Sequence, residues 1–266
     1  MSLRAYAIAY LTFLYAPIFL LPLFAFNDST IIAFPLTGFT TGWFTELAET
    51  PALHAAVKNS LFIAILTAIF STLLGICAAR AGAKYELPAK RGILGLIMVP
   101  LVLPEIIVGV SLLVVVVNLL DWPLSSWTVI AAHVLVCTPF SIAILNGAFQ
   151  NMDASLEEAA LDLGETPWST FRLVTLPLVM PGLISSLLIS FTISLDEFII
   201  AFFLTGAEPT MPVYIWGLLR FPQKLPAVMA LGTILVVASI IILTIAEIMR
   251  RRGLKRAGLK DTGGFL

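Results

Sequence analysis

Carboxylates are concentrated in one short stretch of this chain. The sequence SLEEAALDLGETPWSTFRLVTLPLVMPG begins at Ser155 and carries Glu157, Glu158, Asp162 and Glu165 in its first half. Glu158, Asp162 and Glu165 recur at helical spacing, so they would share one face of a helix. Such a face offers docking points to a basic partner. The alternative is a connector that lies on lipid, but an acidic face is repelled by the anionic inner leaflet.

Three further acids, Glu105, Asp196 and Glu197, lie inside long apolar runs. A charge near the bilayer centre costs at least about 2.5–3.5 kcal/mol, so such groups normally face an interior or a water-filled path. The helical rise places all three in the outer half of the membrane or near its outer boundary. Adjacent residues such as Asp196 and Glu197 point about 100° apart. We expect these carboxylates to line a cavity that passes a cationic substrate. Alternatively, they bond neighbouring helices, the backbone freed by Pro104, or a partner subunit.

Membrane spans are the elements that must position these acids. The chain has 266 residues, of which 59% are hydrophobic and 12% charged, and its mean hydropathy is +1.02. A soluble domain has about a quarter charged residues, and several apolar runs here reach the roughly 20 residues that cross a bilayer core. We therefore predict an all-α, polytopic membrane protein with one transmembrane domain. Its six predicted spans are residues 5–26, 57–80, 92–118, 127–149, 177–204 and 226–249.

Basic residues predict the orientation of these spans, since Lys and Arg favour cytoplasmic loops. Arg4 precedes the first span, and clusters follow the second and the last span: Arg80, Lys84, Lys90 and Arg91, and then Arg250, Arg251, Arg252, Lys255, Arg256 and Lys260. Both termini are therefore expected in the cytoplasm, with segment 27–56 outside. The acidic segment 153–176 would be cytoplasmic too, although the charge rule alone does not favour acids there.

The first part of segment 153–176 has the pattern of a short helix. Ser155 and Glu158 have the spacing of a capping box, although Asp153 could cap the helix instead. Apolar residues then recur at helical spacing along one narrow face: Leu156, Ala159, Ala160 and Leu163.

The second part predicts an elbow and another short helix. Gly164 suits the left-handed position just past a helix end. Thr166 and Pro167 supply a cap followed by proline at the first helical position. The second helix is expected to run to about Val174, and Pro177 is expected to close it at the entrance of the fifth span.

This segment resembles the EAA motif in the permease subunits of ABC importers. Glu158-Ala159-Ala160 is followed by three residues and Gly164, then by nine residues and Val174-x-Leu176-Pro177, with valine where the motif usually has isoleucine. In that family the segment is the coupling helix, which inserts into a groove on the ATPase subunit. The resemblance implies that this contact involves Glu158, Ala159, Ala160, Gly164, Leu176 and Pro177.

Three other stretches look like the spermidine/putrescine branch of these permeases, and most resemble the second of its two permease subunits. They are FNDSTIIAFPLTGFTTGWFTEL, LPEIIVGVSLL and SLDEFIIAFFLTG. The resemblance implies the type I ABC importer permease fold with six transmembrane helices in a bacterial inner membrane. It also implies import of a polyamine or a related small cationic solute.

The same resemblance implies a set of partners. These are two ATPase subunits that hold ATP and Mg, a second permease subunit expected to be a different chain, an extracytoplasmic substrate-binding protein and the lipid bilayer. The chain would not be an enzyme, and catalytic residues, a bound cofactor, a metal site and a nucleic-acid partner are not expected. The Walker A pattern G-x-x-x-x-G-K-[ST] does not occur in the 266 residues.

Other functions remain open at this point. The chain could be an ABC permease for another small solute. It could be an ion-coupled secondary transporter that uses Glu105, Asp196 and Glu197 as relays; such a protein often has an inverted repeat, which the sequence does not show. A membrane scaffold is a third class, but it has no need for acids at membrane depth.

Three single residues carry simpler expectations. His133, in the fourth predicted span, is expected to hydrogen-bond a neighbouring helix. Cys77 and Cys137 lie in apolar runs and are expected as buried thiols within helices.

Overall fold

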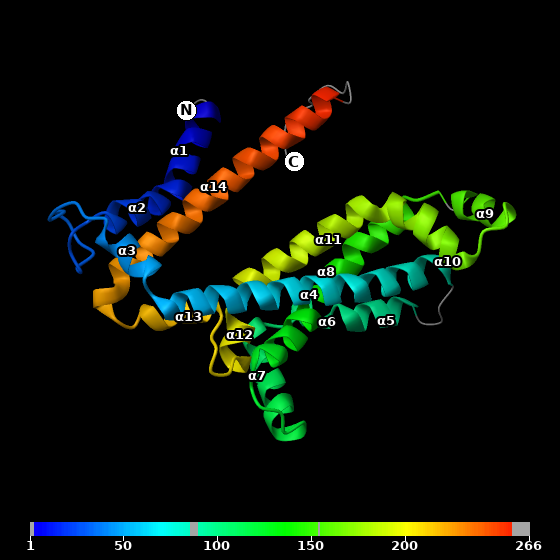
Figure 1. Cartoon of the computed structure of the whole chain (residues 1–266), viewed down its shortest axis with the longest axis horizontal. Coiled ribbons are helices and arrows are strands. Elements are labelled where there is room, and N and C mark those ends of the chain that lie inside the picture. The colour runs from blue at the N-terminus through cyan, green and yellow to red at the C-terminus, as the bar shows by residue number, and fades with distance from the viewer. Residues whose placement is uncertain (1–2, 86–89, 154, 257–266) are drawn as a thin grey trace. The chain divides into compact units, whose positions relative to one another are not determined.

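The computed structural model describes residues 3–85, 90–153 and 155–256. Within these residues the chain is helical, and extended backbone pairs only at an isolated bridge between Asn27 and Phe39. The helices form two compact units (Figure 1). One unit contains the residues up to Pro51 and those from Ile215 onward, and the other runs from Ala52 to Tyr214. The predicted all-α class is confirmed.

The first unit packs the start of the chain against its last long helix. Both α2 and α3 lie against α14. An ion pair between Lys224 Nζ and Glu46 Oε1 (2.5 Å) links the two parts of the unit. Its elements are α1 (Leu3–Tyr15), the 3-10 turn η1 (Ala16–Phe19), α2 (Leu20–Ala25), α3 (Gly42–Ala48), the 3-10 turn η4 (Pro222–Lys224) and α14 (Leu225–Arg256).

The second unit carries the residues of functional interest. Its elements begin with α4 (Pro51–Lys84), α5 (Lys90–Ile97), α6 (Val99–Val102), α7 (Glu105–Val114) and the π-turn η2 (Val115–Leu119). They continue with α8 (Ser126–Gln150), α9 (Ser155–Asp162), α10 (Pro167–Thr170), the π-turn η3 (Phe171–Thr175), α11 (Leu176–Asp196) and α12 (Ile199–Leu204). Helix α13 (Met211–Leu218) contains the last residues of this unit.

Helices α8 and α11 pack closely along each other. A Cβ on Gly182 of α11 would lie 2.5 Å from the Cβ of Ala148 in α8, so only glycine permits this approach. Membrane helices associate through such small residues and through side-chain hydrogen bonds between helices. Three pairs of side chains bond α11 to its neighbours: Ser190 Oγ with Ser141 Oγ (3.0 Å), Ser194 Oγ with His133 Nδ1 (2.8 Å) and Ser186 Oγ with Thr72 Oγ1 of α4 (3.0 Å).

Five of the described helices are long and apolar enough to cross a membrane: Leu3–Ala25, Pro51–Lys84, Ser126–Gln150, Pro167–Asp196 and Pro222–Ile241. A further apolar helix, Glu105–Leu119, is shorter. Together they overlap the six predicted spans. The first and fourth predicted spans agree with the helices to within two residues, the second and sixth overlap theirs with shifted ends, and the third and fifth differ more.

The predicted third span, residues 92–118, is not one continuous helix. Helix α6 ends at Val102, Leu103 is extended with ψ of 142°, and α7 begins at Glu105 after Pro104. Proline lacks a backbone N–H and disfavours helical geometry in the residue before it, so the helix breaks at this point. Glu105 therefore begins a helix instead of lying inside one.

The predicted fifth span, residues 177–204, both begins and ends earlier than expected. The chain stays helical from α10 through η3 into α11, so Pro177 does not close the preceding helix as predicted. The residues just before α11, Phe171–Thr175, form a short π-helix, and Pro177 lies at the second position of α11. At the other end α11 stops at Asp196, Glu197 is extended with ψ of 118°, and α12 follows.

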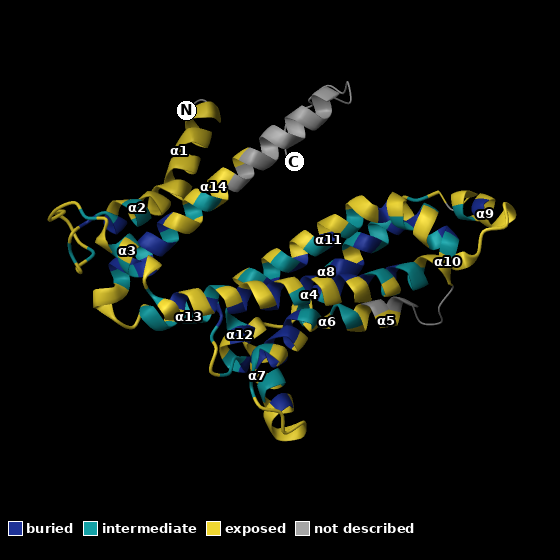
Figure 2. Cartoon of the chain, in the orientation of Figure 1, coloured by how far each residue is buried: buried dark blue, intermediate teal, exposed yellow. Residues whose placement is uncertain are grey.

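Many large apolar side chains are exposed, and exposed residues run along most of the described helices (Figure 2). Helix α1 has no buried residue. In the most apolar 18-residue stretch of Leu3–Ala25, only 6% of the residues are buried. Such a helix needs lipid or another membrane subunit to cover it, because water does not solvate a continuous apolar surface of this size.

Candidate functional site

Helix α9 begins at Ser155, and the cap contact is made by Asp153, the alternative that the sequence offered, instead of a Ser155–Glu158 capping box. The Asp153 carboxylate accepts a hydrogen bond from the Ser155 N–H (3.0 Å). This backbone hydrogen bond, with a side-chain one from Ser155, holds the pKa of Asp153 below its usual range. Glu157 and Glu158 lie in the first turn of α9, where the helix dipole favours negative charge.

The elbow after α9 is also confirmed. Gly164 has φ of +90°, a conformation that L side chains rarely adopt. The Thr166 hydroxyl accepts a hydrogen bond from the Ser169 N–H (3.2 Å), and Pro167 is the first residue of α10. These residues hold α9 and α10 as a bent pair at the edge of the second unit (Figure 1).

The predicted apolar face of α9 is largely uncovered by this chain. Within α9, all of whose residues are described, Ala160 alone is buried. Glu158 and Ala159 are exposed. Just after α9, Leu163 is 87% exposed, and in α10 Trp168 is 71% exposed. An exposed surface that combines acids with large apolar side chains is typical of a protein–protein contact.

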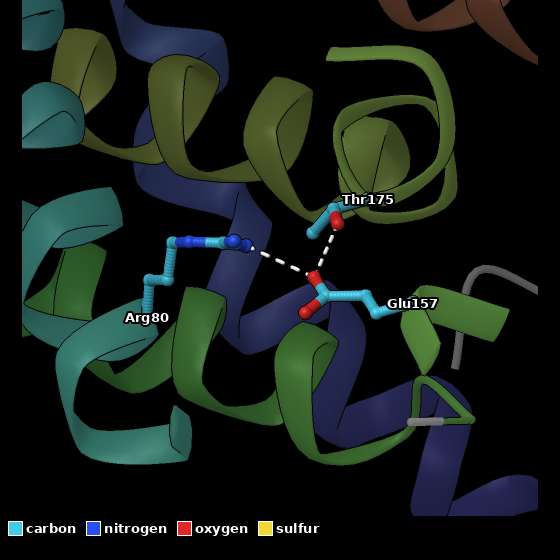
Figure 3. A network of polar contacts seen from close by, with 3 residues as sticks. All are labelled: Arg80, Glu157 and Thr175. Atoms are coloured by element: carbon cyan, nitrogen blue, oxygen red, sulfur yellow. Dashed lines mark hydrogen bonds and ion pairs between the residues drawn. The ribbon is translucent and has the colours of Figure 1, made fainter. Parts of the chain in front are cut away.

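The neighbouring acid, Glu157, has a different environment, which the sequence did not predict (Figure 3). Its Oε1 atom lies 3.1 Å from Nη1 of Arg80 in α4. The same oxygen accepts a hydrogen bond from the Thr175 hydroxyl in η3. The Arg80 guanidinium also lies over the Phe171 ring, 4.5 Å from its centroid. One carboxylate therefore connects α9 with α4 and with the start of α11.

Burial opposes ionisation of Glu157, but its partners outweigh that effect. The hydrogen bond from Thr175 and the positive charges of Arg80 and Lys84 bring the pKa of the Glu157 carboxyl below its usual range. The side chain is 17% exposed and that of Arg80 is 24% exposed. The pair is thus mostly withdrawn from water and charged at neutral pH.

A hollow of about 330 Å³ opens beside α9. Glu157 and Glu158 line one side of it, and the end of α4 supplies basic groups on the other. Its lining residues are Arg80, Ala83, Lys84, Phe149, Met152, Glu157, Glu158 and Leu161. The motif residues Leu176 and Pro177 lie at the start of α11, half-buried and exposed respectively.

The structure places the three membrane acids at interruptions of helices. Glu105 is the exposed first residue of α7, and Asp196 is the exposed last residue of α11. Glu197 is half-buried, and its Oε1 accepts a hydrogen bond from the Ile200 N–H (2.9 Å) at the start of α12. Asp196 and Glu197 thus differ in exposure.

Helix packing brings two of these acids toward each other. Helices α7 and α12 pack together, and Gly109 of α7 lies against Phe203 and Ile200 of α12. The Glu105 carboxylate is close enough to that of Glu197 to repel it. Two broken helices therefore present acids at the same end of a packed pair. Unwound helix segments of this kind often form ion and substrate sites in transporters.

Of the expectations for single residues, those for His133 and Cys137 are confirmed and that for Cys77 is not. His133 bonds Ser194 of α11, which confirms a helix-packing role. Cys137 is buried, but Cys77 is exposed, so the prediction for Cys77 is wrong. Cys77 lies on a face of α4 that this chain leaves uncovered. In the part of the chain that the structure describes, no three His, Cys, Asp or Glu side chains are grouped to hold a metal ion.

Apolar spans, interrupted helices with acids and an exposed α9–α10 pair define a membrane transport subunit. The chain belongs to the family of binding-protein-dependent transport system inner membrane components, whose sequence profile matches residues 71–254. The chain is therefore a multi-pass protein of the inner membrane.

Curated relatives agree with this family. The chain is 36% identical over 252 residues to the putrescine transport system permease protein PotI of Escherichia coli (strain K12), which covers 92% of this chain and 89% of the relative. It is 32% identical over 240 residues to the spermidine/putrescine transport system permease protein PotC of the same strain, with 90% of each chain covered. The resemblance to this branch is confirmed.

Solved structures show the same fold. A bacterial alginate ABC transporter in complex with an alginate pentasaccharide-bound periplasmic protein has a chain with a TM-score of 0.72 and 22% identity, covering 94% of this chain and 92% of that one. A second structure, of a bacterial ABC transporter involved in alginate import, gives a TM-score of 0.71 with 16% identity, covering 93% and 94%. At these identities the likeness establishes the permease fold and no more.

Proposed function

We propose that this chain is a permease subunit of an ATP-driven importer of polyamines or a related small cationic solute. The observation that carries the proposal is the bent α9–α10 pair, which has the EAA spacing and leaves Glu158 and Ala159 exposed. The named transport systems of its relatives, for putrescine and for spermidine and putrescine, support the solute class.

Energy would enter through the α9 segment. Separate ATPase subunits would hold ATP and Mg, and α9 would sit in a groove on one of them. Glu158 and Ala159 would make the contact, Ala160 would seat α9 on its own chain, and Gly164 would set the bend toward α10. Leu176 and Pro177 would join this unit to α11. Closure of the ATPases on ATP would then move α9 and, through it, the membrane helices.

The substrate path would run past the interrupted helices. A polyamine loses favourable hydration on entering the membrane, and carboxylates compensate for that loss. Glu105, Asp196 and Glu197 are the candidates, because the breaks before α7 and after α11 expose two of them and half-expose the third.

Other subunits would complete the transporter. A second permease subunit, which we expect to be a different chain, would cover part of the exposed apolar surface and supply the other half of the path. An extracytoplasmic binding protein would deliver the solute. The solved complex of the alginate transporter with a periplasmic protein is consistent with this arrangement.

Co-purification with the ATPase tests the proposal. Ala159→Trp places a large side chain on an exposed site of α9 and should abolish co-purification without disturbing the fold. Gly164→Pro should do the same by removing the elbow. Ala207→Trp, at an exposed alanine in a loop far along the chain from α9, is the matched control and should have no effect.

Three outcomes would count against this proposal or part of it. If the chain carries out transport without any ATPase, it is an ion-coupled secondary transporter. If Ala159→Trp retains the ATPase at the level of the unaltered chain, α9 is not the docking element. A permease for another solute would keep ATPase binding but show no competition of uptake by putrescine or spermidine.

A further inference from the structure

Two adjacent glutamates in the first turn of α9 have opposite surroundings. Glu158 is exposed, and no residue in the described part of the chain hydrogen-bonds its carboxylate. Glu157 is 17% exposed and contacts two other segments. Successive helical residues point about 100° apart, so one acid turns outward while the next turns toward the membrane helices.

The two partners of Glu157 lie at the same end of two different spans. Arg80 is four residues before the end of α4 at Lys84. Thr175 directly precedes Leu176, the first residue of α11. A single oxygen of Glu157 is bonded to both side chains (Figure 3). A displacement of α9 would therefore act on both α4 and α11 through this oxygen, in addition to the packing of α9 against η3.

The contacts are also costly to replace. The Thr175 side chain is fully buried, so its hydroxyl has little access to water if Glu157 is removed. Arg80 is held from a second side by the ring of Phe171, which belongs to η3 as Thr175 does. A planar guanidinium can stack on a ring and donate to a carboxylate at once, which an ammonium group does less well.

We propose that Glu157 is a positioning residue that transmits the movement of α9 to α4 and α11 together, whereas Glu158 faces the ATPase. This inference rests on the proposed function, because it takes α9 as the segment that the ATPase moves. It predicts a division of labour between neighbours: loss of Glu158 weakens binding of the ATPase, and loss of Glu157 leaves binding intact but separates ATP hydrolysis from transport.

The experiment uses the whole transporter, assembled with its partner subunits in proteoliposomes. Three quantities are measured for each variant: ATPase co-purified, ATP hydrolysed, and putrescine or spermidine taken up. Glu157→Gln removes the charge but keeps the shape, and Thr175→Val removes the hydroxyl. Thr175→Ser retains the hydroxyl and Arg172→Gln removes an exposed charge from the same turn, so both serve as controls.

We expect Glu157→Gln and Thr175→Val to retain the ATPase and its hydrolysis while uptake per ATP falls about tenfold, the scale set by losing a charge-assisted hydrogen bond. Both controls should keep the parent ratio. Glu158→Gln should instead reduce the amount of ATPase that co-purifies. A contact that only stabilised the fold would lower all three quantities together.

Two results would overturn the inference. One is an unchanged ratio of uptake to hydrolysis in Glu157→Gln and Thr175→Val with the ATPase bound. The other is loss of the bound ATPase in these two variants, which would make Glu157 part of the docking surface or of the fold. Failure of the proposed function is distinct, because then no ATPase co-purifies with the unaltered chain either.

Discussion

The contacts of Glu157 with Thr175 and Arg80 stabilise the ionised form of its carboxyl. Its folded-state pKa is below the usual range, so its contacts stabilise the protein fully above the ordinary glutamate pKa of about 4.3. That stabilisation is lost as the pH falls through the lowered pKa of the folded state, because protonation removes the ion pair with Arg80. The network is therefore intact at neutral pH.

A pH series on Glu157→Gln checks this account. At pH 7 the substitution should lower the free energy of unfolding by about 1 kcal/mol. The difference from the parent should shrink below about pH 4.3, where the parent also loses the charge. Thermal unfolding of the purified protein measures it, with the exposed Glu158→Gln as control. A difference that stays constant or grows on acidification would contradict the assigned ion pair.

Neutralising a membrane acid tests the substrate path. Asp196→Asn should reduce uptake of a cationic solute about tenfold, since a charge compensation worth roughly 1.4 kcal/mol is lost. Uptake over a range of solute concentrations separates affinity from maximal rate. Glu49→Gln, an exposed acid outside the long apolar helices, is the control. Unchanged affinity and rate in Asp196→Asn would remove this residue from the path.

The difference between Glu157 and Glu158 could not be predicted from the sequence. Both are acids in the first turn of one helix, and the motif spacing singles out Glu158. Only the position of the end of α4 decides that Arg80 meets Glu157. The available signal is an arginine at the inner end of the second predicted span, which the charge rule already explains.

Among the elements, the α9–α10 pair follows local rules that act within a few residues. Asp153 binds the first amide of α9, Gly164 adopts a positive φ, and Thr166 caps α10. Each was predicted because the side chain bonds backbone nearby or because only glycine is free of strain. The exposure of the pair was predictable only through the resemblance to a docking helix.

Substitution at the elbow tests its conformational role. The φ of +90° at Gly164 costs an L side chain about 1–2 kcal/mol, and nothing lies within 4 Å of an added Cβ, so the cost is conformational. Gly164→Ala should weaken ATPase affinity about tenfold by depopulating the bent form. Gly164→Asn should weaken it less, because asparagine tolerates this region better.

Titrating the ATPase subunit against the Gly164→Ala and Gly164→Asn proteins measures both affinities and shows which substitution weakens binding more. Gly147→Ala is the control, since Gly147 lies in α8 with open space around it and no positive φ. Equal affinity for all the proteins, or a larger loss for asparagine than for alanine, would contradict the elbow.

The spans show where sequence periodicity stops being informative. Hydropathy located them, but a uniformly apolar run contains no signal for its own interruption. Pro104 is an exception, because proline interrupts a helix, and α7 begins directly after it. The break after Asp196 has no proline or glycine at all, and the hydrogen bond from Ile200 to Glu197 marks it only in three dimensions.

At the scale of the whole molecule, the proposed function makes this chain one component of a larger assembly. Its apolar exterior includes α1, which buries no residue within the chain. Its membrane acids lie at helix breaks that the described residues leave partly open, and α9 presents acids and apolar groups outward. Lipid, a second permease and an ATPase would cover these surfaces respectively. Composition and the EAA spacing predicted this dependence on partners, but not which faces would be left bare.

ATP-dependent uptake into proteoliposomes that contain the complete complex tests the central claim most directly. ATP is trapped on the side of the ATPase, and binding protein with labelled putrescine or spermidine is added outside. We predict accumulation that requires ATP, persists when an ionophore dissipates the proton gradient, and is lost in Ala159→Trp. Uptake that proceeds without ATP, or that the ionophore abolishes, would contradict the account.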